Sequence, residues 1–334
     1  MTQPELRETA AALVRPGTGI LAADESVATC SGRLEALGID SSEPSRRAYR
    51  HLLISAPGIE DHISGVILFD ETIRQSTDES VAFPDLLTER GILPGIKVDT
   101  GAKPMAGAPG ETVTEGLDGL RERIAEYYEL GARFAKWRAV VNIGDGLPTR
   151  RAVVANAHAL ARYAALCHEG GLVPIVEPEV LMKGDHDIDR CYEVTGDVLT
   201  EVFSQLRLAE VDLASIVLKP SMVVPGADAS DVPVSEVATR TVECLRETVP
   251  AAVAGVAFLS GGQSPSVATE HLAAMVGLGP HPWPLTFSYG RAIQDDVLST
   301  WAGDDANADS ARAVLLERAQ ANGDAALGKV PTAA

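Results

Sequence analysis

Paired cysteines, histidine clusters and long apolar runs are all missing from this sequence of 334 residues, and each absence excludes a class of protein. The cysteines are Cys30, Cys167, Cys191 and Cys244. They lie far apart without a C-x-x-C pair, which indicates free thiols rather than a disulfide framework. The longest apolar stretch, residues 250–259, is too short to span a bilayer. Residues 1–6 have no basic flank before an apolar segment, so we expect no signal peptide and a cytoplasmic protein without a membrane partner.

The histidines give little indication of a metal site. Seven are scattered through the chain, and none belongs to an H-E-x-x-H or similar ligand spacing. The cluster Asp185-His186-Asp187 resembles a ligand set, but it stands where a helix is expected to begin. Acidic side chains at such a place commonly cap the helix. We therefore expect neither a catalytic metal nor a cofactor.

Basic residues are in the minority, with 28 Lys and Arg against 47 Asp and Glu and a formal net charge of −19. Such a surface repels polyanions, which excludes nucleic acid and anionic membranes as expected partners. A small anionic ligand would need a local basic pocket. The chain length suits one large α/β barrel or two ordinary domains, and its 46% of hydrophobic residues is sufficient for a substantial core.

Eight short runs with strand character recur along the chain, and a helix-sized segment follows each of them. The runs are 19–23, 65–69, 95–98, 134–137, 173–176, 216–218, 256–259 and 285–287. Several consist almost entirely of Val, Ile, Leu and Phe, as expected where both faces of a strand are covered. This pattern predicts a single (β/α)8 TIM barrel with additional helices over residues 1–334. A doubly wound open sheet is the alternative.

Helix signals stand between the runs. Ser42-Glu43-Pro44 predicts a helix that ends near residues 57–58, and Thr112-x-x-Glu115 resembles a capping box before a helix that ends at Gly131. Further helices are expected over 148–170, 185–208, 233–249, 265–277 and 291–301. Residues 302–334 are expected to form one last helix, about 308–322, and a mobile tail.

Charged and small polar residues gather where the runs end, which in a barrel is the catalytic face. They are Asp24, Ser26, Lys97, Lys136, Arg138, Glu177, Glu179, Lys219, Ser260, Gly261, Gly262, Ser288, Gly290 and Arg291. Any one of them could be part of a structural ion pair. Charges on apolar strands are costly to bury unless they are paired, so unrelated defects would not collect at one end of every strand.

Lys219 is the candidate nucleophile, because it ends an apolar strand and is expected to lose part of its hydration. Lys136 and Arg138 are expected on a neighbouring strand, and both effects disfavour the ammonium form and leave an amine able to form an imine with a ketone. The alternative is a structural ion pair with Glu177 or Glu179. Loss of water from the carbinolamine needs an acid, which Glu177 can supply, and carbon–carbon cleavage needs a base, for which Asp24 and Glu177 are the candidates.

Two places are suited to phosphate. Ser260-Gly261-Gly262 precedes a helix that begins after Ser264, where backbone N–H groups can approach an anion. Gly290-Arg291 adds a guanidinium after the last run, and this corner of a barrel commonly binds phosphate. A second basic cluster of Arg33, Lys97 and Arg138 would serve a second phosphate.

The strand-end segments closely resemble class I fructose-bisphosphate aldolases of the animal and plant type. The segments are GILAADES (19–26), GVILF (65–69), GIKVD (95–99), FAKWR (134–138), VPIVEPE (173–179), LKP (218–220), FLSGGQS (258–264) and LTFSYGR (285–291). The similarity runs in order from about residue 5 to residue 325. It implies reversible cleavage of fructose 1,6-bisphosphate to dihydroxyacetone phosphate and glyceraldehyde 3-phosphate, in glycolysis and gluconeogenesis, by a homotetramer.

The resemblance also assigns roles to individual residues. Lys219 would form the Schiff base and Glu177 would be the principal acid–base residue, with Asp24, Lys136 and Glu179 completing the catalytic set. The phosphate nearest the ketone would lie against Ser260, Gly261, Gly290 and Arg291. The other phosphate would lie towards Lys97, Arg138 and Arg33. Gly262, Ser288 and Ser26 are further candidate substrate-binding residues.

The sequence departs from the family pattern at several places. Animal and plant members end in a tyrosine that assists proton exchange on the enamine, whereas no tyrosine follows Tyr289 here, so another group handles that proton or the step is slower. The family's Lys-Pro-Asn reads Lys-Pro-Ser221, and Thr29 and Gly32 stand where relatives have serine and a second basic residue. The preference between bisphosphate and monophosphate ketoses therefore stays open.

Three other interpretations compete with this one. Another Schiff-base barrel, such as a transaldolase or a deoxyribose-phosphate aldolase, shares the strand-end lysine but gives no reason for two separated basic clusters. A scaffold that keeps the fold without turnover would be expected to have lost Lys219, Glu177 or Asp24, and all three are present. A zinc-dependent class II aldolase is disfavoured because a histidine cluster is absent.

Overall fold

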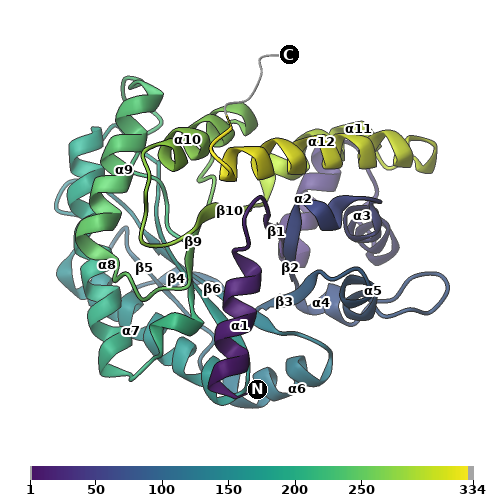
Figure 1. The fold of residues 1–334 in the computed structure, drawn as a ribbon, viewed down its shortest axis with the longest axis horizontal. Coiled ribbons are helices and arrows are strands. Elements are labelled where there is room, and N and C mark those ends of the chain that lie inside the picture. Colours follow the sequence, from purple (N-terminus) through teal and green to yellow (C-terminus); the bar gives the residue numbers. More distant parts are fainter. Residues whose placement is uncertain (1, 330–334) are drawn as a thin grey trace.

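The centre of the computed structural model, which describes residues 2–329, is a closed barrel of eight parallel strands (Figure 1). These strands are β1 (Gly19–Ala23), β2 (Ile63–Leu68), β3 (Leu93–Lys97), β6 (Phe134–Val141), β7 (Val173–Val180), β8 (Val217–Leu218), β9 (Gly255–Phe258) and β10 (Leu285–Tyr289). They follow one another around the barrel in chain order, and β10 closes the ring by pairing with β1. The predicted (β/α)8 barrel is confirmed, and the alternative of an open sheet is wrong.

The predicted strand ends are least accurate at β6 and β7, which each continue four residues beyond the predicted run. The β7 extension alternates charged and apolar residues, and the β6 extension begins with Arg138 opposite Glu177. The charged side chains point into the barrel mouth while the backbone continues to pair. Continuous apolar runs therefore underestimate the length of strands that end in charged site residues.

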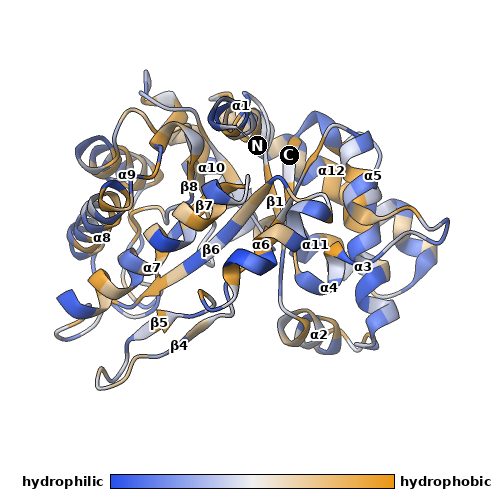
Figure 2. Cartoon of the chain, turned by 90° about the horizontal axis from the view of Figure 1, so that it is seen from below, coloured by the Kyte–Doolittle hydropathy of each residue, from blue (hydrophilic) through white to orange (hydrophobic). Residues whose placement is uncertain are grey.

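Helices surround the barrel and follow its strands. They are α1 (Gln3–Leu13), α2 (Val27–Ala36), α3 (Glu43–Ser55), α4 (Asp70–Ile73), α5 (Phe83–Glu89), α6 (Leu120–Glu129), α7 (Arg150–Glu169), α8 (Ile188–Leu208), α9 (Val234–Thr248), α10 (Pro265–Gly277), α11 (Arg291–Trp301) and α12 (Ala308–Ala326). The predictions for α3 and for α7 to α11 hold to within three residues at each end. Figure 2 shows the hydrophilic faces of α8 and α9 turned outwards, with their apolar faces against the barrel.

The predicted capping box at Thr112 is wrong. Residues Thr112–Thr114 form strand β5, which pairs antiparallel with β4 (Ala102–Pro104) in a hairpin between β3 and α6 (Figure 2). The β-branched Thr-Val-Thr run favours a strand. Helix α6 begins only after Gly119, whose φ of 65° an L-residue rarely adopts.

The last helix, α12, extends four residues beyond the predicted end at 322 and packs against α10, α11 and α3. Its apolar side, which includes Ala311, Leu315 and Ala319, is fully buried. The expected mobile tail begins after residue 322 and is wrong for residues 323–326, which belong to α12. Its last part, residues 330–334, lies outside the described residues.

The amino-terminal end of the barrel is filled with apolar side chains. Helix α1 crosses this end (Figure 1), and its Leu6 and Leu13 join Phe134 of β6 in one buried cluster. The strands make room for the ring of Phe134 by carrying glycine: a Cβ on Gly95 would stand 2.2 Å from it. The only space left for a ligand inside the barrel is therefore at its carboxyl-terminal end.

Candidate active site

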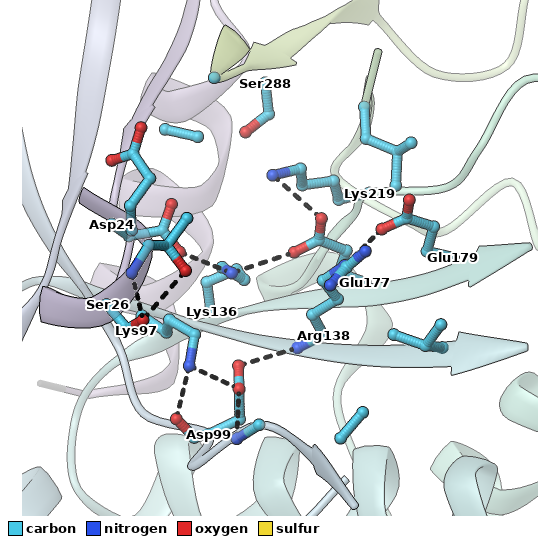
Figure 3. Close-up of a pocket in the computed structure, with 18 of the residues that line it drawn as sticks. Asp24, Ser26, Lys97, Asp99, Lys136, Arg138, Glu177, Glu179, Lys219 and Ser288 are labelled. Carbon is cyan, nitrogen blue, oxygen red and sulfur yellow. Dashed lines mark hydrogen bonds and ion pairs between the residues drawn. The ribbon is translucent and has the colours of Figure 1, made fainter. Parts of the chain in front are cut away.

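One cavity of about 640 Å³ opens at the carboxyl-terminal ends of the strands (Figure 3). Every predicted site residue except Gly262 lines it. Gly262 lies just outside, where a Cβ would stand 3.9 Å from the Arg291 guanidinium, so its inclusion among the lining residues is not supported. Its φ of 97° shows why glycine is needed at this turn.

Lys219 follows β8 directly, and its side chain is 4% exposed. Its Nζ lies 3.2 Å from Glu177 Oε1, on the adjacent strand β7. Glu179, the other predicted partner, pairs with Arg138 instead. The expectation that Lys136 and Arg138 occupy a strand next to Lys219 is wrong, because β7 lies between β6 and β8.

Lys136 stands between two carboxylates at the centre of the cavity, as the dashed lines of Figure 3 show. Its Nζ lies 2.6 Å from Asp24 Oδ2 and 3.4 Å from Glu177 Oε2. Burial disfavours the Lys136 ammonium, but the nearby carboxylates outweigh this effect and raise its pKa. Burial would likewise raise the pKa of Asp24, but the charges of Lys136, Lys219 and Lys97 lower it. Lys136 and Asp24 are therefore both ionised near neutral pH.

Two buried oxygen atoms in the cavity have no hydrogen-bond partner among the described residues. They are Glu177 Oε2 and Ser288 Oγ. The 3.4 Å contact between Glu177 Oε2 and Lys136 is an electrostatic one that lacks hydrogen-bond geometry. An unpaired buried polar atom costs free energy, and such atoms in a cavity are typical of groups that find their partner in a bound ligand.

At one end of the cavity the lining consists of small residues and one cation. We call this the Arg291 end; it comprises Ser260, Gly261, Ser288, Gly290 and Arg291. Ser264 accepts a hydrogen bond from Val267 and so fixes the start of α10, while α11 begins at Arg291 without a side-chain cap. Among residues 2–329 the exposed Arg291 side chain has no ion pair. Free N–H groups at a helix start and an unpaired guanidinium are suited to an anion.

In a second part of the cavity every cation is paired with a carboxylate. We call this the Arg33 end; it comprises Ser26, Arg33, Lys97 and Arg138. Arg33 pairs with Glu25 and Asp295, and Arg138 pairs with Glu179. Lys97 Nζ donates to Asp99 Oδ1 at 2.6 Å and to the Asp99 carbonyl at 2.7 Å.

Glu25 and Asp99 are lining residues that the predicted site did not include. The Asp99 carboxylate also accepts the backbone N–H groups of Gly101 at 3.1 Å and Arg138 at 3.2 Å, so it ties the start of the β4–β5 hairpin to β6. Both acids lie at the ends of predicted strands, next to residues of the predicted site. This position alone would have been enough to include them in the site, but the sequence does not show which cation each acid binds.

No group of three His, Cys, Asp or Glu side chains able to hold a metal ion occurs among residues 2–329. Asp187 accepts a hydrogen bond from the Arg190 N–H at 2.8 Å, which confirms its predicted capping role, although α8 begins three residues later than expected. All four cysteines are free and buried. No helix in this part of the chain is long and apolar enough to cross a membrane.

The fold and the cavity together define a class: a (β/α)8-barrel enzyme with a buried lysine beside carboxylates, and with further cations along the cavity wall. The class I fructose-bisphosphate aldolase family model matches residues 5–334. The chain is 56% identical to a probable class 1 fructose-bisphosphate aldolase of Xylella fastidiosa, over 98% of this chain and 99% of the relative. It is 51% identical to the cytosolic aldolase 4 of Arabidopsis thaliana, over 97% of this chain and 83% of the relative.

A solved structure gives the same result. A Plasmodium falciparum fructose-bisphosphate aldolase, solved in complex with TRAP and a small-molecule inhibitor, superposes with a TM-score of 0.97 at 47% identity, covering 99% of this chain and 96% of that one. This chain belongs to the class I fructose-bisphosphate aldolase family. It is an aldehyde-lyase that acts on a carbon–carbon bond.

Proposed function

We propose that Lys219 is the nucleophile that forms an imine with the ketone of fructose 1,6-bisphosphate. The observation that carries this proposal is a buried amine at the cavity wall, 3.2 Å from the carboxylate of Glu177. A proton can pass from the Lys219 ammonium to Glu177, which leaves the nitrogen lone pair free to attack the carbonyl carbon. The carbonyl oxygen takes a proton from the attacking nitrogen and becomes the hydroxyl of a carbinolamine. Glu177 then returns its proton to this hydroxyl, which leaves as water, and the carbon–nitrogen bond becomes the protonated imine.

The same carboxylate is placed to act in cleavage. The protonated imine accepts the electron pair of the C3–C4 bond and becomes an enamine, while the C4 hydroxyl gives its proton to Glu177 and becomes the aldehyde. Asp24, the other candidate base, is already held by Lys136 at 2.6 Å. We propose that Asp24 keeps Lys136 ionised and in place, so that Lys136 stabilises negative charge on the reacting oxygen atoms.

The two ends of the cavity would hold the two phosphates. We propose that the phosphate nearest the ketone binds at the Arg291 end, where Ser288 Oγ is buried without a partner. The second phosphate would bind at the Arg33 end. Arg138, held by Glu179, would contribute charge there from the side of β6. Holding both phosphates fixes the C3–C4 bond above the imine.

The test is borohydride trapping with dihydroxyacetone phosphate in the presence of EDTA. Reduction should convert the imine to a stable secondary amine, and peptide mapping should find the adduct on Lys219. Lys219→Met should abolish both trapping and turnover. Lys103→Met, which removes an exposed lysine of β4, is the matched control and should change neither. An adduct on another residue, or turnover that EDTA abolishes, would contradict the proposal.

The Glu177→Gln variant tests whether the proton transfers depend on Glu177 while Lys219 still acts as the nucleophile. The amide cannot exchange the protons of dehydration and cleavage, so turnover should fall by about 10²-fold or more. Slow trapping on Lys219 should persist, since the amine remains. Equal loss of both signals would show that Glu177 acts only by holding Lys219.

We also propose a cytoplasmic homotetramer that acts in glycolysis and gluconeogenesis. The resemblance to animal and plant aldolases supports the assembly, and the similarity to a cytosolic plant relative supports the location. Sedimentation equilibrium would test the assembly, and a monomer at micromolar concentration would contradict it. Cell fractionation followed by activity measurement would test the location.

A further inference from the structure

A buried arginine that does not line the cavity contacts one of the acids that does. Arg50 lies on α3, its side chain is 3% exposed, and its Nη1 donates to Glu25 Oε2 at 2.5 Å. Arg50 Nη2 also donates to the Glu25 carbonyl at 3.1 Å. The other carboxylate oxygen of Glu25 accepts from Arg33. Glu25 is therefore shared, with one oxygen bound to a cation of the cavity and one bound to a cation behind it.

This sharing controls how much of the Arg33 charge is available to a ligand. An unshared carboxylate binds arginine through two parallel hydrogen bonds and neutralises it. Here Arg50 occupies one oxygen, so Glu25 can offer Arg33 only the other. The three groups together carry one excess positive charge. Arg33 and Glu25 line the cavity, so Arg33 is the cation of the three that a ligand can reach. Asp295, the other acid on Arg33, has a half-exposed side chain and is screened by solvent.

A neutral amide holds the remaining side of Arg33. Gln294 is fully buried at the start of α11, and its Oε1 accepts from Arg33 at 3.1 Å and from the Tyr49 hydroxyl at 2.8 Å. Its Nε2 donates to the Ala22 carbonyl at the end of β1. The Tyr49 ring lies near both guanidiniums, with its centroid 6.0 Å from that of Arg33 and 5.8 Å from that of Arg50. These contacts fix the Arg33 head without neutralising it.

We propose that Arg50 is a positioning residue that sets the preference for ketose bisphosphates over ketose monophosphates. It occupies one oxygen of Glu25 and thereby leaves Arg33 able to bind the second phosphate. The inference rests on the proposed function, because it assumes that the second phosphate lies at the Arg33 end. Arg50 itself touches neither substrate nor reacting atoms.

The experiment compares kcat/KM for fructose 1,6-bisphosphate and fructose 1-phosphate. In Arg50→Met, Glu25 can turn both oxygens to Arg33, and kcat/KM for the bisphosphate should fall about tenfold through KM, the size of one lost charged contact. The value for fructose 1-phosphate should stay within twofold. Arg46→Met is the matched control: this arginine lies one turn earlier on α3 and pairs with Glu71 at 2.6 Å, not with Glu25. It should leave the ratio of the two substrates unchanged.

A second substitution that removes the Glu25 charge distinguishes the proposed role of Arg50 from a simple loss of structure. Adding Glu25→Gln to Arg50→Met removes the acid that would capture Arg33, so the bisphosphate preference should return to within about threefold of the original. This double variant also leaves no buried charge unpaired, which keeps the test available if Arg50→Met alone unfolds. Arg50→Lys, which retains the charge, should lose less than Arg50→Met.

The outcomes distinguish the inference from the function on which it rests. An unchanged substrate ratio in Arg50→Met, the same loss in Arg46→Met, or failure of the double variant to recover the ratio would each overturn the inference while leaving imine trapping on Lys219 intact. Failure of trapping in the unaltered enzyme would overturn the proposed function first.

Discussion

The two ends of the cavity present their cations in different ways. At the Arg291 end, an unpaired guanidinium, two glycines and the start of α11 face the cavity, and the lining there includes no acid among the described residues. At the Arg33 end, Glu25, Asp99 and Glu179 already hold the three cations. A phosphate at the first end meets free donors, whereas a phosphate at the second must share cations with resident acids.

This difference predicts which end of the cavity determines the choice between substrates. Free donors bind any phosphate with little dependence on what surrounds them, so the Arg291 end should contribute similarly to every phosphorylated substrate. The Arg33 end offers a small net charge that depends on how each acid is held. Small changes around that end should therefore alter selectivity without altering the chemistry at Lys219.

The largest expected effect is on stability and concerns the ion pair of Asp24 and Lys136 at the centre of the cavity. Asp24→Asn leaves Lys136 without its closest partner at 2.6 Å and should lower the free energy of unfolding at pH 7 by about 3 kcal/mol. Because the folded-state pKa of Asp24 is lowered, its stabilisation is complete above the unfolded value of roughly 4 and is lost as the pH falls through the folded-state pKa. Urea unfolding across this range measures it. A difference between the two proteins that stays constant from pH 7 down through the acid range would contradict this account.

The next effect tests the Arg291 end. Arg291→Ala removes its only guanidinium, and kcat/KM should fall about a hundredfold, or roughly 2.7 kcal/mol, for fructose 1,6-bisphosphate and fructose 1-phosphate alike. Steady-state kinetics with both sugars gives the result. Arg15→Ala, at the opposite end of the barrel, is the control. A loss confined to one substrate would place Arg291 outside the phosphate nearest the ketone.

A smaller effect is expected at the other end. Arg33→Ala should lower kcat/KM for the bisphosphate about thirtyfold, or roughly 2 kcal/mol, because one charged contact to the second phosphate is lost. The monophosphate has no group at this place and should react as before. Equal losses for both sugars would remove the distinction between the two ends.

The smallest effect concerns the support of the Arg33 end. Asn156 of α7 holds the β4–β5 hairpin by accepting the Thr114 N–H at 3.2 Å and donating to the Thr112 carbonyl at 2.8 Å. Asn156→Ala should lower the free energy of unfolding by about 1.5 kcal/mol, since two buried backbone groups lose partners. Urea unfolding measures this loss. The variant should raise KM for the bisphosphate slightly and leave the monophosphate unchanged, and an effect on both would show that the hairpin supports the whole cavity.

The fold was predictable because the eight runs carry both a strand pattern and a position in chain order. Chain order alone also places the strand of Glu177 between those of Lys136 and Lys219, so the expectation that Lys136 neighbours Lys219 failed against information already in the sequence. The capping box failed because Thr112 and Glu115 satisfy a local rule, whereas pairing of β5 with β4 is decided by contacts with residues ten positions away.

The sequence predicted which residues line the site, but it did not predict which acid pairs with which cation. A strand-end position is a local property, and it brought Asp24, Lys136, Glu177 and Lys219 together. Which acid holds which cation depends on side-chain directions across strands and helices. The contact of Arg50 with Glu25 joins α3 to the end of β1, and no spacing rule indicates it.

Phe134 and α1 fill the amino-terminal half of the barrel, so the cavity is closed at its inner end. Sugar and products must use the same opening. On the proposed mechanism, the fragment bonded to Lys219 cannot depart before its imine is hydrolysed, whereas the aldehyde is free once the carbon–carbon bond has broken. The aldehyde would then leave first and the ketone last, and water for the hydrolysis would enter through the opening that the aldehyde has vacated.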